Sequence, residues 1–189
     1  MTSIVRADNI STVAGTGTVT VQAGNTLDTS AGLVTPAGHV IQVVQGSSNS
    51  SASYNSPTYQ TYYDGNATVS ITPSSTSSKV LIMLEATCQV RSTSLIEIGI
   101  GLRLRRGTDV IFTTGDTSMR SAMQLEAIGS GASDLRMVNR VSVTYLDSPN
   151  TTNEITYNFQ GSPFVQATSM QLGGYAGAYT QFTLMEIAG

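Results

Sequence analysis

Residues 80–90 read VLIMLEATCQV, and their side chains alternate between two kinds along the whole stretch. One face is apolar throughout, whereas the other carries Glu85, Thr87 and Gln89. A period of two is the pattern of a half-buried β-strand, because successive side chains of a strand point to opposite faces of the sheet. Residues 96–104, IEIGIGLRL, repeat the pattern with an apolar side chain at every second position. These stretches predict two long strands that contribute to one core.

Shorter stretches on both sides of these two show the same alternation. Strands are predicted at residues 67–71, 110–112, 141–145, 155–159 and 182–184, and turn sequences separate several of them. About seven or eight strands at short spacing are typical of an antiparallel sandwich or jelly roll. Strands do not alternate with helices, which argues against a parallel α/β sheet. Residues 118–128 fit either a short helix or a loop.

The first 45 residues differ in composition from the rest. They are rich in Gly and Thr, and residues 16–21 (TGTVTV) and 40–44 (VIQVV) each predict a strand. This part has too few large apolar residues for a core of its own, so it must pack on the head, on symmetry mates or on a partner. We therefore expect a short N-terminal β arm at 1–45, a flexible Ser-rich linker at 46–56 and an antiparallel β-sandwich or jelly-roll head at 57–189.

The composition excludes several classes of protein. Only 11% of the 189 residues are charged, the net charge is -3, and 24 serines and 26 threonines supply most of the polarity. A nucleic-acid partner needs a basic surface, which this chain lacks. No apolar run reaches the roughly 18 residues of a membrane span, so we expect no membrane insertion. The N-terminus has no apolar signal-peptide core, which indicates synthesis in a cytoplasm without Sec export. A surface rich in hydroxyl groups suits a particle or fibre exposed to the environment.

The single cysteine and the single histidine do not indicate a catalytic site. Cys88 is in phase with Ile82 and Leu84, so a buried core thiol is favoured over a nucleophile. One cysteine also excludes an intramolecular disulfide framework and a cysteine-rich zinc site. His39 follows Pro-Ala-Gly with no carboxylate nearby in the sequence, so we interpret it as a loop residue at the start of a strand rather than a general base.

Two pairs of acidic residues are candidates for the paired carboxylates of glycoside hydrolysis, namely Asp109 with Asp116 and Asp147 with Glu154. They lie in or beside turn sequences, where Asp commonly binds its own backbone, and we favour this structural role. No Asp-x-Asp-x-Asp spacing indicates calcium. The sequence therefore predicts no catalytic residue, no metal site, no cofactor and no enzymatic activity.

Other residues indicate contacts between subunits. Gly99 and Gly101 lie opposite the apolar face of residues 96–104, which indicates either a flat face where another backbone approaches or a bulge. Three arginines at 103, 105 and 106 form either a solvated hairpin end or an intersubunit ion pair with Glu97 or Asp109. The eight tyrosines fit a paratope-like surface or ordinary surface loops. The expected oligomer interface comprises Val19, Val21, Val40, Val43, Gly99, Gly101, Arg103 and Arg105.

Several motifs in order resemble one group of proteins. Residues 3–10 (SIVRADNI), 15–21 (GTGTVTV) and 40–45 (VIQVVQ) resemble the N-terminal part of small virion proteins of marine phages and cyanophages. The C-terminal domain of the same group is similar to residues 71–80 (ITPSSTSSKV), 144–149 (TYLDSP), 155–157 (ITY) and 184–188 (LMEIA). The likeness spans most of the chain and depends on the order and spacing of the motifs. It implies a trimeric β protein of the capsid-decorating or fibre type.

These observations together predict a non-enzymatic, homotrimeric phage virion surface protein that is located on the virion. The arm cannot satisfy its own strand edges, so we expect trimerisation or docking to supply the missing partners. In the first hypothesis the arm attaches to the capsid exterior, and the protein decorates and cements the capsid. In the alternative it is a short tail fibre or receptor-binding protein for host attachment. The expected partners are the chain itself, phage capsid or tail proteins and, for the fibre, a host-surface glycan or receptor.

Overall fold

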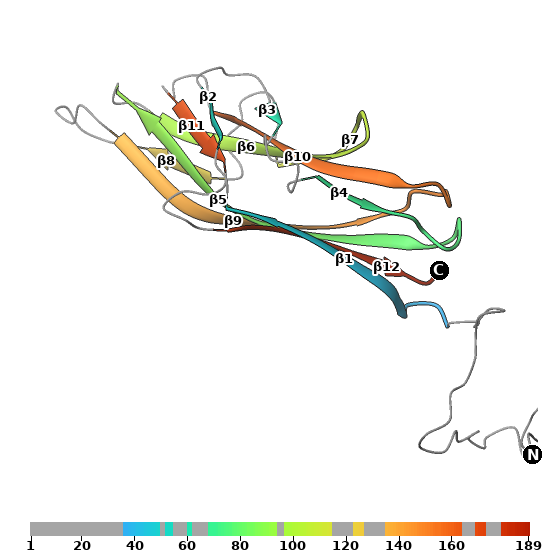
Figure 1. The fold of residues 1–189 in the computed structure, drawn as a ribbon. Coiled ribbons are helices and arrows are strands. Elements are labelled where there is room, and N and C mark those ends of the chain that lie inside the picture. Colours follow the sequence, from blue (N-terminus) through green and yellow to red (C-terminus); the bar gives the residue numbers. More distant parts are fainter. Residues whose placement is uncertain are drawn as a thin grey trace, which may run out of the picture. The chain divides into compact units, whose positions relative to one another are not determined.

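The computed structural model describes residues 36–49, 52–54, 60–61, 68–93, 97–114, 123–126, 135–163, 169–172 and 179–189. Within these ranges the chain forms strands and no helix, and the strands make two antiparallel sheets that face each other as a sandwich (Figure 1). The predicted all-β fold with a sandwich head is therefore confirmed. The predicted arm with Val19 and Val21 lies outside the described residues.

The first sheet, called sheet A, is built around the longest strand, β5 (Lys79–Ser92). On one edge of β5, β12 (Thr180–Ile187) pairs with residues 79–85 and β11 (Ser169–Leu172) pairs with residues 88–91. On the other edge, β9 (Leu135–Asp147) pairs with residues 80–92. Outside β12 and β11 lie β1 (Val40–Ser48) and β2 (Ala52–Tyr54). Hence β1 and β9 lie on opposite edges of sheet A.

The second sheet, sheet B, is built around the pair β10 (Ile155–Pro163) and β6 (Glu97–Arg106). The outer edge of β10 pairs with β4 (Thr68–Ile71) and β3 (Gln60–Thr61). The outer edge of β6 pairs with β7 (Asp109–Thr113) and β8 (Met123–Glu126). Strand β8 lies where the sequence predicts a short helix or a loop, because the edge of β6 from Glu97 to Ile100 supplies a partner that no local pattern encodes.

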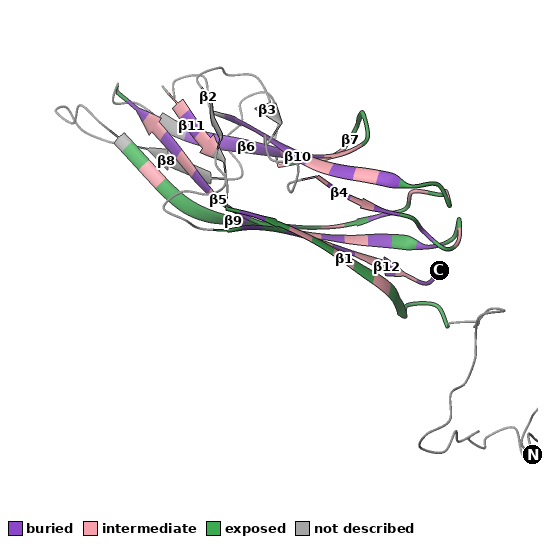
Figure 2. Cartoon of the chain, viewed as in Figure 1, coloured by how far each residue is buried: buried purple, intermediate pink, exposed green. Residues whose placement is uncertain are grey.

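The core lies between the two sheets and follows the period of two. The inward side chains of β5 are each at most 2% exposed, whereas the residues between them are partly or fully exposed (Figure 2). Opposite them lie apolar side chains of β6 and β10, including Leu102, Leu104, Tyr157 and Phe159. Full burial of one such side chain contributes about 1.5–3 kcal/mol. The alternation that predicts the strands therefore also provides the energy that holds the sheets together.

Strand β1 crosses the boundary expected at residue 45. It pairs with β12 from Val40 to Ser48, and the ladder is extended by Gly38 N donating to Ala188 O at 2.7 Å and Ala188 N donating to His39 O at 2.8 Å. Residues 40–45, expected in the arm, and 46–48, expected in the linker, therefore belong to sheet A. The physical reason is the inward face of β1, where Val44 packs against the core. β2 also lies inside the expected linker.

The turn between β6 and β7 depends on a glycine. Gly107 has a φ of +57°, and a Cβ added there would meet nothing within 4 Å. Gly107→Ala is therefore expected to cost about 1–2 kcal/mol of unfolding free energy through backbone conformation alone. Denaturant unfolding measures this loss. Gly107→Asn is the matched control, because Asn tolerates the left-handed region better and should lose less. Equal losses in the two variants would contradict this account.

Candidate functional site

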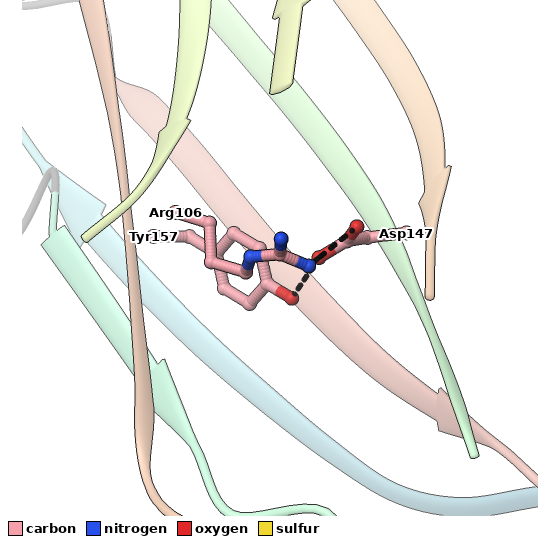
Figure 3. A network of polar contacts seen from close by, with 3 residues as sticks. All are labelled: Arg106, Asp147 and Tyr157. Carbon is pink, nitrogen blue, oxygen red and sulfur yellow. Dashed lines mark hydrogen bonds and ion pairs between the residues drawn. The ribbon is translucent and has the colours of Figure 1, made fainter. Parts of the chain in front are cut away.

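A polar network joins the two sheets at one end of the sandwich. Asp147, at the end of β9, is 5% exposed and accepts a hydrogen bond from the Tyr157 hydroxyl at 2.7 Å. Arg106 Nη1 lies 3.2 Å from each carboxylate oxygen of Asp147 (Figure 3). The three residues come from β9, β10 and β6, so the network connects sheet A to sheet B. The carboxylate of Asp147 thus serves as an acceptor between strands, while Glu154, its candidate partner in catalysis, is exposed.

The hydroxyl of Tyr157 is held in its protonated form. Burial raises the pKa of Tyr157, and the hydrogen bond to Asp147 and the charge of that carboxylate raise it further, against a smaller lowering by Arg106. The hydroxyl therefore remains a donor to Asp147 across the physiological pH range. Within the chain, Arg106 forms an ion pair with Asp147. The intersubunit ion pair of the three arginines with Glu97 or Asp109 stays a prediction.

A second buried carboxylate, Glu186 of β12, fixes the loop before β5. Its Oε1 accepts hydrogen bonds from Ser74 N at 2.7 Å and Ser74 Oγ at 2.6 Å. Its Oε2 accepts one from Gln42 Nε2 at 2.6 Å, and the same Nε2 donates to Thr72 O at 2.7 Å. Burial raises the pKa of Glu186, but hydrogen bonds from Ser74 and Gln42 outweigh it and hold the pKa below its ordinary value. This network joins β1, β12 and the 72–78 loop.

Sequence reasoning missed Glu186, although a signal was present. It is in phase with Phe182 and Leu184, both 0% exposed, so the period of two places its carboxylate on the inward face of β12. An acidic residue on a buried face implies hydrogen-bond donors nearby, because an unpaired buried charge is very costly. The donors come from Ser74 and Gln42, far away in the sequence.

The structure divides the expected interface residues between the two sheets. Val40 and Val43, on β1 of sheet A, are 52% and 55% exposed. Gly99 and Gly101 lie in β6 of sheet B and are buried. Their pairing registers with β8 and β10 are continuous, so neither glycine forms a bulge. The expected interface residues that the structure describes are therefore divided between β1 of sheet A and β6 of sheet B. Their role between subunits stays a prediction.

The two arginines of the expected interface make contacts within the chain. Arg103 Nε donates to Gln160 Oε1 at 2.5 Å across the β6–β10 pair. Arg105 Nη2 donates to the carbonyl of Thr108 in the following turn. These contacts fix both side chains beside β10 and the β6–β7 turn. They are compatible with a solvated hairpin end, one of the two alternatives that the sequence leaves open for these arginines.

Cys88 is a core thiol, as predicted. It is 0% exposed, and burial raises the pKa of its thiol to about 12. Since the thiolate is the reactive form, we expect native protein at pH 8 to react with a thiol reagent only as fast as it unfolds. A colorimetric thiol assay with and without denaturant measures this. Stoichiometric labelling of the native protein within seconds would contradict the expectation.

The remaining candidates for chemistry lie at the surface. His39 is exposed at the start of β1, Asp109 is exposed at the start of β7, and Asp116 lies outside the described residues. Among the described residues, no three His, Cys, Asp or Glu side chains gather where they could hold a metal ion. An open depression of about 490 Å³ lies between the β6–β7 turn and residues 149–156, with Asp109 and Glu154 in its lining. Its walls are the β6–β7 turn, the loop before β10 and the adjoining ends of β6, β7 and β10, and it opens widely to solvent.

The exposed apolar side chains are concentrated on two strands. In the part of the chain that the structure describes, seven large apolar residues are exposed, and five of them lie on the sheet A edge strands β1 and β9: Val40, Ile41, Val43, Val138 and Leu146. Concentration on one sheet distinguishes this surface from the scattered apolar residues found on any protein. No helix in the described ranges has the length and apolar character to cross a membrane.

No protein-family model matches this chain, and no curated protein matches it in sequence.

Proposed function

We propose that this chain is a non-enzymatic, homotrimeric structural protein of a bacteriophage particle, which decorates and cements the capsid exterior and displays the β-sandwich as a head. The resemblance of its ordered motifs to small virion proteins supports the phage assignment. The observation that carries the structural role is the set of exposed apolar side chains on the edge strands β1 and β9. Open edges with apolar side chains favour pairing or packing with another chain.

The scarcity of charge determines how such a protein would attach. The salt bridge between Arg140 and Glu85 on sheet A has both side chains about half exposed, with exposed fractions of 49% and 48%. An exposed pair of this kind contributes at most about 1 kcal/mol and is screened by salt. Attachment would therefore depend on weak apolar contacts repeated by symmetry, with avidity in place of high single-site affinity. Retention on particles should change little between low and high salt.

Copy number on purified particles tests the proposal most directly. Quantitative mass spectrometry against the major capsid protein should give hundreds of copies per particle for a decoration protein. Particles that lack the protein should lose their genome at a lower temperature than particles that carry it. A count of a few copies would overturn the decoration role and support a fibre, and absence from particles would overturn both.

The role of the arm is tested by a truncation whose end point the structure determines. Removing residues 1–45 would delete most of β1, whereas removing residues 1–35 leaves the whole β1–β12 ladder in place. The chain without residues 1–35 is expected to keep the β-sheet signal of the head in circular dichroism but not to bind particles that lack the protein. Binding equal to that of the full chain would show that the arm is not the attachment segment.

One observation favours the alternative, a short tail fibre or receptor-binding protein. The open depression at the β6–β7 turn is lined by polar groups, including Thr108, Asn153 and Glu154. Polar groups in an open hollow at the tip of a sandwich suit recognition of a host-surface glycan. In this role the purified protein would reduce infection by occupying the receptor, and Asn153→Ala would weaken that block. Absence of any block at saturating protein would overturn the alternative.

A further inference from the structure

An apolar row crosses the outer face of sheet A from one edge to the other. The pairing register places Val43 of β1 beside Met185 of β12, Met185 beside Leu81 of β5, and Leu81 beside Leu146 of β9. The two ends of the row, Val43 and Leu146, are 55% and 49% exposed, whereas the two middle residues are partly buried. With strands about 4.8 Å apart, the row is about 14 Å long and runs across the strands. No charged residue belongs to it.

Charged residues limit the apolar surface along β5. Lys79 lies two positions before Leu81, and Glu85, which is paired with Arg140, lies two positions after Met83. Four strands by four outward positions, with Lys79 and Glu85 at the two ends on β5, correspond to roughly 500 Å² of sheet face, and the two middle positions provide about half of it. In the proposed trimer, three such faces together bury roughly 1,500 Å², more than the about 1,000 Å² that a specific protein interface requires. The outer face of sheet A is therefore large enough to bind a second copy of this chain.

The surface beside the row is also hollowed. Met83 and Glu85 of β5 and Gln181 and Thr183 of β12 line a depression of about 190 Å³, immediately next to the row along both strands. A depression of this size accommodates one or two side chains of a partner. A partner would contact the row with apolar side chains and insert one or two side chains into the depression. These two contacts together would give the shape complementarity that stable interfaces show.

The arrangement of the row matches rotational symmetry about an axis parallel to the strands. The row runs perpendicular to the strands, so both of its ends lie at the same position along such an axis. A rotation about the axis can therefore bring the two ends of neighbouring copies together. The β1 end of one copy then meets the β9 end of the next. Contacts between two different patches close into a ring when the rotation closes. Among the described strands, β1 pairs only with β12 and β9 only with β5, so no described strand occupies the outer edge of either.

We propose that the outer face of sheet A is the surface through which three copies of this chain associate, with Val43 of one copy packed against Leu146 of the next. The inference rests on the proposed homotrimer and assigns the surface that forms it. Met185 and Leu81 of the three copies line the axis. Val40 and Val43 keep the interface role that the sequence predicts for them, and Leu81, Leu146 and Met185 join them.

Cross-linking of the full chain tests the contact itself. In the double variant Val43→Cys/Leu146→Cys, the two thiols of one copy are about 14 Å apart, too far for an internal disulfide, which needs Cα atoms within about 7 Å. Cys88 is buried and does not compete. Under mild oxidation we expect covalent dimers and trimers on a non-reducing gel and no larger species. Monomers alone, or a ladder extending beyond trimers, would overturn the proposal.

The matched control pairs Val43→Cys with Val110→Cys. Val110 lies on β7 of sheet B and is 48% exposed, so its accessibility matches that of Leu146 while its position does not. This variant is expected to remain monomeric on the same gel. Trimers that form equally well in the control would overturn the assignment of the surface.

A charge substitution separates this inference from the proposed function. The wild-type chain is expected to sediment at three times its mass of 19.8 kDa at micromolar concentration. Val43→Glu and Leu146→Glu should each sediment as monomers with an unchanged far-ultraviolet circular dichroism spectrum, whereas Val110→Glu should remain trimeric. Wild-type monomers would overturn the proposed trimer and this inference with it. A wild-type trimer that persists in both sheet A variants would overturn this inference alone.

Discussion

Glu186→Ala is expected to lower the free energy of unfolding by about 3 kcal/mol at pH 7. The substitution removes the acceptor for two donors of Ser74 and one of Gln42. A buried donor left without a partner costs about 1–3 kcal/mol. Ser74 is exposed and Gln42 Nε2 keeps Thr72 O as an acceptor, so the total stays near the lower end of the sum. Chemical denaturation at pH 7 measures the loss. A change below 0.5 kcal/mol, roughly that of an ordinary surface substitution, would contradict the role of this network.

The same carboxylate makes stability depend on pH in a defined direction. The pKa of Glu186 is lower in the folded chain than in the unfolded chain, where it is about 4.3. The ionised form therefore stabilises the fold above the unfolded pKa, and this stabilisation is lost as the pH falls through the folded value. In Glu186→Gln the contribution is absent at every pH. The stability difference between the wild type and Glu186→Gln should shrink from pH 7 towards pH 3, and a constant difference would contradict the account.

Asp147→Ala is expected to cost about 3 kcal/mol, the second large effect. It leaves the Tyr157 hydroxyl without an acceptor in a fully buried position and removes the partner of Arg106. Removing one member of a buried ion pair costs about 3–5 kcal/mol, and the 30% exposure of the Arg106 side chain reduces this figure. Tyr157→Phe should cost only about 1 kcal/mol, because Asp147 keeps its ion pair with Arg106.

A comparison with an exposed pair shows whether burial is the cause. Glu85→Ala removes the partner of Arg140 on the surface of sheet A and should cost at most about 1 kcal/mol. The double variant Asp147→Ala/Tyr157→Phe should be more stable than the sum of the single losses implies, with a coupling of about 0.5–3 kcal/mol. Additive losses would show that the two side chains do not interact in solution.

The sequence predicts the strands and their inward faces because both are local properties. Along β5, each side chain on the apolar face that the alternation defines is buried. Pairing is not local. The contact of β1 with β12 joins residues more than 130 positions apart, and it places residues 40–48 in the head although their composition resembles that of the arm. The strand at 123–126 likewise depends on the free edge of β6.

The proposed interface on sheet A could be predicted only in part from the sequence, because it depends on strand pairing, which is not a local property. Exposed Val40 and Val43 follow from the alternation at 40–44. The row from Val43 to Leu146 requires three pairing registers at once, and no pattern within one strand contains them. Gly99 and Gly101 lie in β6, which pairs on both edges, and their role between subunits stays a prediction. Buried Glu186 was visible in the period of two, but its donors were not.

The pairing of β1 with β12 has a mechanical consequence for a head that is held through its N-terminal side. The chain enters the sheet at Val40, and β1 continues from there for nine residues alongside β12. Tension applied through residue 36 in the direction of β1 would load the hydrogen bonds to β12 in shear. A pull perpendicular to the strand would instead open these hydrogen bonds one after another from the end of β1. For a pull along β1, separating β1 from β12 requires the hydrogen bonds of the nine-residue strand to break together.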